Sequence, residues 1–303
     1  MPGHPIRRTL GSMLTCLGAA QGIALARWLG RGLADGNWPA ITRAERQLGL
    51  AFGGNLSPEE RATLARESFV EAAVCWAEMM FLASDRRWSQ WRDRVEVEQP
   101  AHWGPLRDEG RGAIVATSYL GNPAVAAAAA AELLGLAWLI TSPLADINLR
   151  TWQENLARRP GTLKALPARH AVAAAPRLLE AGERLIVLAE HQRATGPAVE
   201  LTFLGQPHRC YPTIGVLADG CDVPVAVVVA RRSEVAFHFT LTMEELVDPR
   251  ELPAGDRPAT VTRRVMCAIE RAIRRSPEQY LWSRPWLGGA RSLEEFPRRK
   301  ERL

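Results

Sequence analysis

In its central part the chain alternates short apolar runs with helix-forming runs, and this alternation limits the possible folds more than any other feature. Residues 112–117 and residues 137–141 are apolar runs of strand length. Between them, Asn122 suits a helix cap, Pro123 fits the first helical turn, and the alanine-rich run 124–134 favours a helix. This order of strand, helix and strand predicts a parallel βαβ unit with a right-handed connection.

The alternation continues toward the C-terminus without an internal repeat, a low-complexity tract or a Pro/Gly linker. We expect one α/β domain over residues 55–303, with a mixed, largely parallel central sheet flanked by helices, and a helical N-terminal extension over residues 1–54. The patterns predict helices over residues 171–181, 214–218 and 259–275, and strands over residues 184–190, 199–204, 223–230 and 236–243.

The domain opens with a helix-start signature. Ser57 suits the cap position, Pro58 fits the first helical position, and Glu60 completes a capping box. Apolar residues at helical spacing from there to about residue 83 predict a long amphipathic helix. Residues 84–110, rich in Trp, Arg and Asp, predict a connecting segment with short elements.

The N-terminal extension contains an uncharged stretch, residues 9–26, with arginines on both sides. Its length is at the lower limit for crossing a bilayer, and several glycines and polar residues dilute its apolar content. A helix on a membrane surface, a helix packed into the fold and a membrane span all remain open, whereas no signal-peptide cleavage pattern is present. We expect residues 1–54 to be a membrane-associating helical segment. One apolar stripe recurs at helical spacing: Leu10, Leu14, Leu17, Ala20 or Gln21, Ala24 and Trp28.

The basic residues are almost all arginine. Of 38 basic side chains only Lys164 and Lys300 are lysines, and the formal net charge is +5. Arginine binds phosphate and carboxylate groups in a bidentate way, so the excess suits nucleic acid, anionic lipid or a phosphorylated cofactor. Codon bias in a GC-rich genome also explains the arginine excess and is the simpler explanation. The five cysteines are scattered without a CxxC pair, which indicates small apolar fillers in a reducing compartment.

Polar residues follow two of the predicted strands. Residues 117–122 lead into a helix N-terminus, whose free amides and dipole favour an anion or a developing oxyanion. Glu190, His191 and Gln192 follow another strand. A histidine beside a carboxylate at a strand end can act as a general base, although a solvated loop histidine gives the same pattern.

The common cofactor and catalytic motifs are missing from the sequence. It contains no P-loop, no GxGxxG, no GxSxG and no HExxH, and no cysteines or histidines at metal-ligand spacing. We therefore expect neither a cofactor nor a metal ion.

Several short blocks occur in the order found in one family, and over about residues 41–286 the chain resembles the bacterial late acyltransferases of lipid A biosynthesis. This lauroyl/myristoyl type lies within the lysophospholipid acyltransferase superfamily, and the resemblance implies an acyltransferase-like α/β fold. The blocks are Thr117–Ala124 with its Gly121-Asn122 turn, Glu190-His191-Gln192, Val199–Pro207 with Phe203-Leu-Gly205, Tyr211-Pro-Thr213-Ile-Gly215, Val223-Pro-Val225, and Pro277-Glu278-Gln279-Tyr280-Leu281-Trp282.

The catalytic positions depart from the family pattern. In the family, a histidine takes a proton from the acceptor hydroxyl, an acidic residue orients it, and an acyl group leaves a carrier-protein thioester. With the Gly-Asn turn aligned, the histidine falls at Tyr119, the acidic residue at Ala124 and a further family arginine at Ser142. A phenol with a usual pKa near 10 is almost wholly protonated at neutral pH, so the standard mechanism should fail.

Two functions are compatible with these residues. In the first, the chain is a divergent acyltransferase that moves an acyl group from a carrier-protein or CoA thioester to a hydroxyl or amine acceptor. His191 with Glu190 is then a relocated base, Tyr119 meets the thioester carbonyl or the acceptor, and further residues bind substrate: Ser118, Gly121, Asn122, Ser142, Gln192 and Gly205. In the second, an inactive homologue binds acyl chains or a carrier protein as an accessory to a partner enzyme.

The resemblance also bears on partners and location. It implies a carrier-protein or CoA thioester as partner and disfavours nucleic acid. Arg7, Arg8, Arg27 and Arg31, which flank the uncharged stretch, then become candidate anchors on an anionic membrane surface. We expect the protein at the cytoplasmic face of the inner membrane, or in the cytoplasm.

Overall fold

The computed structural model describes residues 18–36, 38–84, 88–108, 110–141, 162–191, 196–284 and 287. Its centre is a seven-stranded sheet in the order β1-β9-β8-β2-β5-β3-β4, and every neighbouring pair is parallel except β8 and β9. The expected α/β fold with a mixed, largely parallel sheet is confirmed. The strands are β1 (Val95–Val97), β2 (Ala113–Thr117), β3 (Ala137–Thr141), β4 (Leu163–Pro167), β5 (Arg184–Leu188), β8 (Val225–Arg232) and β9 (Phe239–Val247).

The two strands of the predicted βαβ unit, β2 and β3, are parallel but not neighbours. Helix α6 (Pro123–Leu134) connects them, and β5 lies between them in the sheet. Ile114 of β2 pairs with Leu185 of β5, and Leu139 of β3 pairs with Ile186. The carboxyl ends of β2, β5 and β3 therefore lie side by side at one edge, where open α/β sheets bind ligands.

Some elements differ from the sequence expectations. β1, β4 and β7 (Gln206–Cys210) were not predicted, since β1 has three residues and β4 runs into Pro167. β7 pairs antiparallel with β6 (Val199–Phe203) in a separate two-stranded sheet. The last predicted strand, residues 236–243, is displaced to β9, because the turn between β8 and β9 occupies residues 233–238 and holds Phe237 at a φ of 59°.

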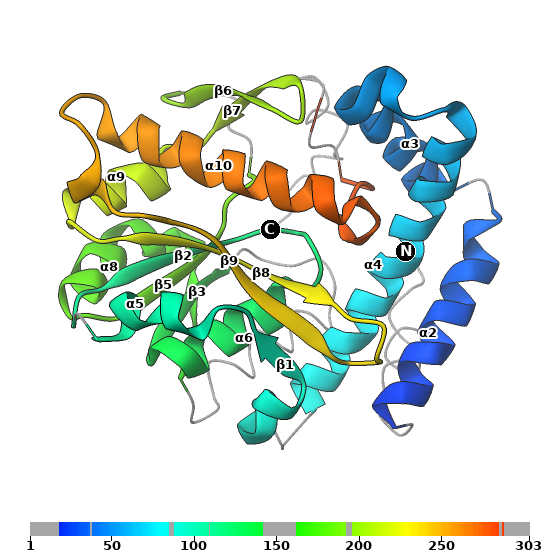
Figure 1. The fold of residues 1–303 in the computed structure, drawn as a ribbon, viewed down its shortest axis with the longest axis horizontal. Helices are drawn as coiled ribbons and strands as arrows, with labels where there is room; N and C mark the ends of the chain where they lie inside the picture. Colours follow the sequence, from blue (N-terminus) through cyan, green and yellow to red (C-terminus); the bar gives the residue numbers. More distant parts are fainter. Residues whose placement is uncertain are drawn as a thin grey trace, which may run out of the picture.

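Helices cover both faces of the sheet (Figure 1). One face carries α8 (Ala168–Glu180), α9 (Thr213–Gly220) and α10 (Arg257–Arg275), and the other carries α5 (Gly104–Asp108) and α6. Because side chains alternate along a strand, β8 contributes Val225, Val227 and Val229 to the first face and Ala226, Val228 and Ala230 to the second. Both faces are thus apolar, as a largely parallel sheet requires.

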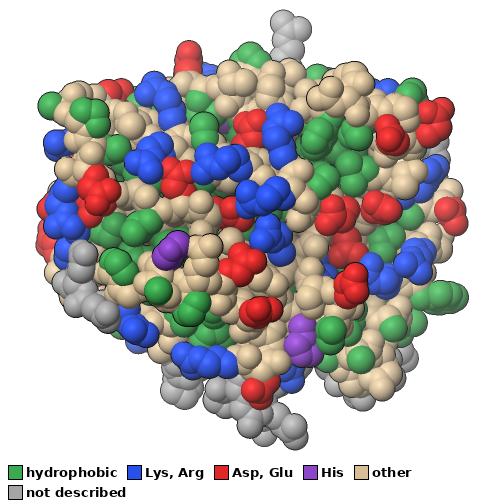
Figure 2. Space-filling model, viewed as in Figure 1, with side chains coloured by type: hydrophobic (Ala, Val, Ile, Leu, Met, Phe, Trp, Pro, Cys, Tyr) green, Lys and Arg blue, Asp and Glu red, His purple; other side chains and the backbone are tan. Residues whose placement is uncertain are grey.

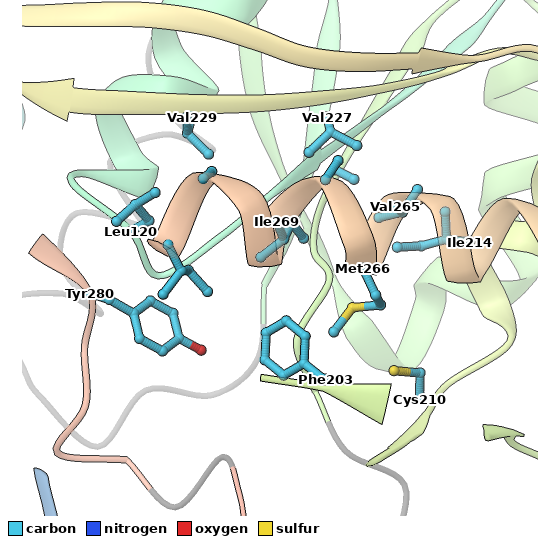
Figure 3. Close-up of a cluster of buried hydrophobic side chains, with 14 of the residues drawn as sticks. Leu120, Phe203, Cys210, Ile214, Val227, Val229, Val265, Met266, Ile269 and Tyr280 are labelled. Carbon is cyan, nitrogen blue, oxygen red and sulfur yellow. The ribbon is translucent and has the colours of Figure 1, made fainter. Parts of the chain in front are cut away.

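Helix α10 contributes several buried side chains to the core on the first face of the sheet. The side chain of Asp256 accepts a hydrogen bond from the amide of Ala259 at 3.1 Å and so caps the helix. Figure 3 shows α10 between β8, which contributes Val227 and Val229, and Phe203 of β6. All three side chains are fully buried, so α10 joins the main sheet to the small hairpin.

The long predicted helix is α4 (Pro58–Ser84). Its capping box is formed as expected, because the Ser57 amide donates to Glu60 at 2.7 Å and the Glu60 amide donates to the Ser57 hydroxyl at 3.1 Å. Two helices of the N-terminal extension, α2 (Ala19–Ala34) and α3 (Pro39–Phe52), pack against α4. The connecting segment after α4 consists of short elements, as predicted: η2 (Trp88–Asp93), β1, η3 (Pro100–Trp103) and α5.

Helix α2 buries a different face from the one the apolar stripe indicates. Gly22, Ile23, Ala26, Gly30 and Ala34 are buried. Of the predicted stripe, Ala20, Gln21, Ala24 and Trp28 face solvent, with Trp28 69% exposed, whereas Leu10, Leu14 and Leu17 lie outside the described residues. Within the described part of the chain, no helix combines the length and the apolarity that a bilayer crossing needs.

Many arginines have acidic partners within the protein. Figure 2 shows basic side chains in a band over α10, with acidic side chains among them. Glu245 of β9 binds both Arg264 and Arg271, at 2.7 and 2.5 Å, and Glu244 binds Arg275. Part of the arginine excess therefore joins α10 to β9 instead of facing an external anion.

Candidate active site

The carboxyl ends of β2 and β5 bring the two predicted polar segments together. Thr117 pairs with Leu188 in the parallel ladder, so the residues that follow each strand emerge at the same edge. The ring centroids of Tyr119 and His191 are 6.0 Å apart, with the rings edge to face. Tyr119 and His191, which follow different strands in the sequence, therefore lie side by side in the fold.

Glu190 lies behind this pair and is fully buried. Its carboxylate accepts a hydrogen bond from the Ser118 hydroxyl at 2.5 Å and from the Tyr119 amide at 3.1 Å. Burial raises the pKa of Glu190 to about 7, against hydrogen bonds from Ser118, Tyr119 and Tyr280 that favour the ionised form. Glu190 is not among the described residues that line the neighbouring cavity. It contacts Tyr119, which does line the cavity.

The turn after Tyr119 is held by close backbone packing. Gly121 has a φ of 64°, and a Cβ atom there would lie 2.0 Å from the carbonyl oxygen of Ala230. Asn122 caps α6 as predicted, because its side-chain oxygen accepts from the amides of Ala124 and Val125 at 3.0 and 3.2 Å. Two of the free amides at this helix start are therefore occupied by the protein itself.

A cavity of about 410 Å³ opens in front of Tyr119 and His191. Side chains of α4, α6, β3 and β5 make most of its wall apolar. Apart from Ser68 and Glu71 of α4, its polar groups come from the strand ends and the C-terminal segment, so the cavity suits an amphipathic ligand. The apolar side chains are Ala72, Trp76, Met79, Pro123, Ala124, Leu139, Ile140, Val187, Leu188 and Leu281, and the polar ones include Ser68, Glu71, Thr117, Tyr119, Thr141, His191, Gln279, Tyr280 and Arg284.

The segment after η5 (Pro277–Gln279) completes the polar end. The Leu281 amide donates to the Tyr119 carbonyl at 3.2 Å, which joins this segment to the turn after β2. The guanidinium carbon of Arg284 lies 4.8 Å from the centroid of the Tyr119 ring. The sequence interpretation did not single out Arg284, because no motif includes it and only the fold brings it to the strand ends.

The titratable groups of the site are shifted in opposite directions. Burial raises the pKa of Tyr119 above its usual value of 10, with Arg284 opposing the shift, so the phenol stays protonated. Burial and the positive charge of Arg284 lower the pKa of His191 below its usual 6.5, so the imidazole is neutral at neutral pH. Tyr119 is therefore a hydrogen-bond donor and His191 a proton acceptor.

A buried ion network joins α4 to β8, and its Glu71 lines the cavity. Arg232 binds Glu78 at 2.6 Å and Glu71 at 2.8 Å, and Arg27 of α2 also binds Glu71. The side-chain amide of Asn122 donates to Glu78 at 3.0 Å. The network thus fixes α2, α4, β8 and the start of α6 relative to one another.

A thiol also lines the cavity. Cys75 of α4 lies next to the network, and burial raises its pKa to about 12 despite the neighbouring Arg232. The thiol is therefore protonated at neutral pH, in agreement with its interpretation as a small filler.

The other predicted site residues have different positions. Ser118 and Asn122 are buried behind the cavity, and Gly121 lines it. Gly205 lies in the turn between β6 and β7 and is not among the described lining residues. Ser142 and Gln192 lie outside the described residues.

Together, the fold and the site define an α/β protein with a mostly apolar cavity at the carboxyl ends of its parallel strands. A family model described as bacterial lipid A biosynthesis acyltransferase matches residues 13–287. The chain belongs to this family, as the resemblance predicted. In a comparison with curated proteins, none matched the chain.

Proposed function

We propose that the protein is an acyltransferase that moves an acyl group from a carrier-protein or CoA thioester to a hydroxyl or amine acceptor. The observation that carries the proposal is the joint position of Tyr119 and His191 at the polar end of an apolar cavity. An acyl chain fits the apolar wall, and its thioester carbonyl then lies near a hydrogen-bond donor and a neutral base.

The reaction uses His191 as the base. The acceptor oxygen or nitrogen attacks the thioester carbonyl carbon while the imidazole of His191 takes the acceptor proton. The carbonyl oxygen becomes negatively charged and accepts a hydrogen bond from the Tyr119 hydroxyl. The carbon–sulfur bond then breaks, and the leaving thiolate takes the proton from His191. An amine acceptor that arrives neutral needs less activation than a hydroxyl.

Glu190 serves this reaction as a positioning residue. Its carboxylate holds the amide of Tyr119 and the hydroxyl of Ser118, which fixes the turn that carries the phenol. Ser118 and Asn122 support the same turn from behind the cavity, since both are fully buried.

A second function has its own support. With the Gly121-Asn122 turn aligned to that of the family, Tyr119 and Ala124 fall at the positions of the catalytic histidine and acid, and on this alignment the family's own mechanism lacks both groups. An inactive homologue that binds acyl chains or a carrier protein, as an accessory to a partner enzyme, would keep the cavity without needing a base.

We place the protein on the cytoplasmic face of the inner membrane, or in the cytoplasm, with an anionic membrane surface as a partner. The exposed stripe of α2 supports this part of the proposal, because Trp28 is 69% exposed and Arg31 lies one turn further along the helix. Tryptophan and arginine are the residues that anchor helices at anionic membrane surfaces. Release from anionic vesicles by rising salt would test it.

The reaction is tested with purified protein, acyl-CoA or acyl-carrier-protein donors, and hydroxyl and amine acceptors. We expect His191→Ala to lower turnover by about 10²–10⁴-fold and Tyr119→Phe by about 10²–10³-fold. His170→Ala and Tyr211→Phe, at exposed positions outside the cavity, are the matched controls.

Two outcomes would decide against the mechanism. Product formation unchanged in both site variants would remove the roles given to these residues. Absence of turnover together with saturable binding of the acyl donor would favour the accessory function.

A further inference from the structure

The cavity has an arginine at its polar end that the reaction above does not use. Among the described residues that line the cavity, Arg284 is the one with a guanidinium group. It comes from the C-terminal segment and lies over the Tyr119 ring, with its guanidinium carbon 4.8 Å from the ring centroid. Guanidinium groups over aromatic faces are held by cation–π attraction, which fixes their direction.

Two other charged groups near the cavity, Glu71 and Arg232, are held in the buried ion network. Glu71 lines the cavity, but its carboxylate binds both Arg27 and Arg232. The Arg232 side chain is only 4% exposed and also binds Glu78 through two nitrogens, at 2.6 and 2.8 Å. Neither Glu71 nor Arg232 is therefore disposed to bind a ligand.

Arg284 lines the cavity, whereas Arg232 does not. Arg284 is half-buried at the cavity wall, within reach of the groups that emerge from β2 and β5. Its charge acts on Tyr119, His191 and Tyr280, which all line the polar end. A permanent positive charge beside a phenol donor, at the end of an apolar cavity, is suited to an oxyanion or a carboxylate.

We propose that Arg284 and the hydroxyl of Tyr119 form an anion subsite that binds the oxygen of an acyl group, as the carboxylate of a free fatty acid and as the oxyanion during transfer. The inference rests on the proposed function in one respect, namely that the cavity takes an acyl chain. The subsite itself is independent of turnover, since a fatty acid requires no reaction to bind.

The subsite predicts discrimination between ligands that share a chain and differ in the head group. Dodecanoate and dodecanol have the same apolar chain, but only dodecanoate is charged at about pH 8. The wild-type protein should bind dodecanoate more tightly, by about 10–100-fold, because hydrogen bonds to charged groups are worth about 1.5–3 kcal/mol. Binding is measured by calorimetry, with dodecanoate below its micellar concentration and dodecanol below its solubility limit.

Substitutions then assign the discrimination to residues. Arg284→Gln should weaken dodecanoate binding to the level of dodecanol and leave dodecanol within about twofold of wild type. Arg284→Lys should keep part of the preference, because the charge remains without the planar fork. Arg43→Gln is the matched control, since Arg43 donates to the carbonyl of the adjacent Ser283 at 2.9 Å from outside the cavity.

Each contrary result has a distinct meaning. An equal fall for both ligands in Arg284→Gln, or a preference that survives the substitution, would overturn the subsite. Equal binding of both ligands by the wild-type protein would overturn it as well, while the acyl cavity would stand. Failure of the wild-type protein to bind either ligand would overturn the acyl cavity and the proposed function with it.

Discussion

The carboxylate of Glu190 accepts a hydrogen bond from the backbone amide of Tyr119 at 3.1 Å, although 71 residues separate them in the chain. The parallel pairing of β2 and β5 makes this contact possible, because both residues follow the same end of the sheet. The contact places a buried acid directly behind the phenol that faces the cavity. The protonation state of Glu190 therefore affects both the fold and the site.

Glu190→Gln should change the pH dependence of stability. The pKa of Glu190 is about 7 in the folded protein and about 4.5 without the fold. Because the folded value is higher, the stability that protonated Glu190 contributes is fully present below about pH 4.5 and is lost as pH rises through 7. Glutamine is neutral at every pH, so the free energy of unfolding of Glu190→Gln should not fall in this way as pH rises.

Urea unfolding of both proteins between pH 5 and 8 measures the difference. Wild type should lose stability relative to Glu190→Gln by a few kcal/mol at most over this range, following the shift from about 4.5 to about 7. Glu200→Gln, at an exposed position on β6, serves as the control and should follow wild type. Parallel curves for wild type and Glu190→Gln would contradict a raised pKa at Glu190.

The pH profile of turnover should depend on His191 and Arg284. His191 acts as a base only when neutral, and its pKa is lowered by burial and by the charge of Arg284. The fall of kcat/KM on the acid side of the pH profile should therefore have its midpoint below pH 6.5. Arg284→Gln should move this midpoint to higher pH, because the positive charge that lowers the pKa of His191 is gone. The comparison is made in the Glu190→Gln background, because Glu190 itself titrates near pH 7. An unchanged midpoint in Arg284→Gln would show that the charge of Arg284 does not affect the pKa of His191.

Much of the fold was predictable because its signals are local. The Ser57–Glu60 capping box and the Asn122 cap with Pro123 are complete within four residues, and both helices begin where these signals place them. The apolar runs of β2 and β3 also formed as expected. The order of the strands was not predictable, since insertion of β5 between β2 and β3 depends on contacts across the whole chain.

The site shows the same division. Tyr119 and His191 could be selected because polar residues follow buried strands, and strand ends bind ligands. Glu190 was predictable as a member of the site, but its burial behind Tyr119 was not. Glu190 lies just beyond the end of β5, and the sequence does not show in which direction a side chain points once the strand has ended. Arg284 was missed, since its link to Tyr119 spans 165 residues and involves no motif.

Gly121→Ala should be far more harmful than a substitution at another glycine with similar backbone geometry. Gly121 and Gly205 have φ values of 64° and 74°, which cost alanine about 1–2 kcal/mol in either place. A Cβ atom at Gly121 would also lie 2.0 Å from the carbonyl oxygen of Ala230, whereas one at Gly205 meets nothing within 4 Å.

Thermal and urea unfolding distinguish the two glycine variants. We expect Gly205→Ala to lose about 1–2 kcal/mol and Gly121→Ala to lose at least about 3 kcal/mol, because the turn must move away from β8. Similar losses in the two variants would show that β8 yields to the added methyl group, and that the close approach at Gly121 does not constrain the turn.

The pairing of Arg232 with Glu78 should give a large coupling energy in a double-mutant cycle. Both side chains are at most 4% exposed, and loss of one leaves a buried charge without its partner, at a cost of about 3–5 kcal/mol. Arg232→Met with Glu78→Leu removes both charges, so the double variant should lose much less than the two single variants together. Arg209 and Glu200, paired at 3.4 Å on the exposed hairpin, give the control cycle, with an expected coupling below about 1 kcal/mol. A coupling energy between Arg232 and Glu78 as small as that of the control pair would mean that water or Glu71 compensates the buried charge. In that case the ion network does not fix α4 against β8.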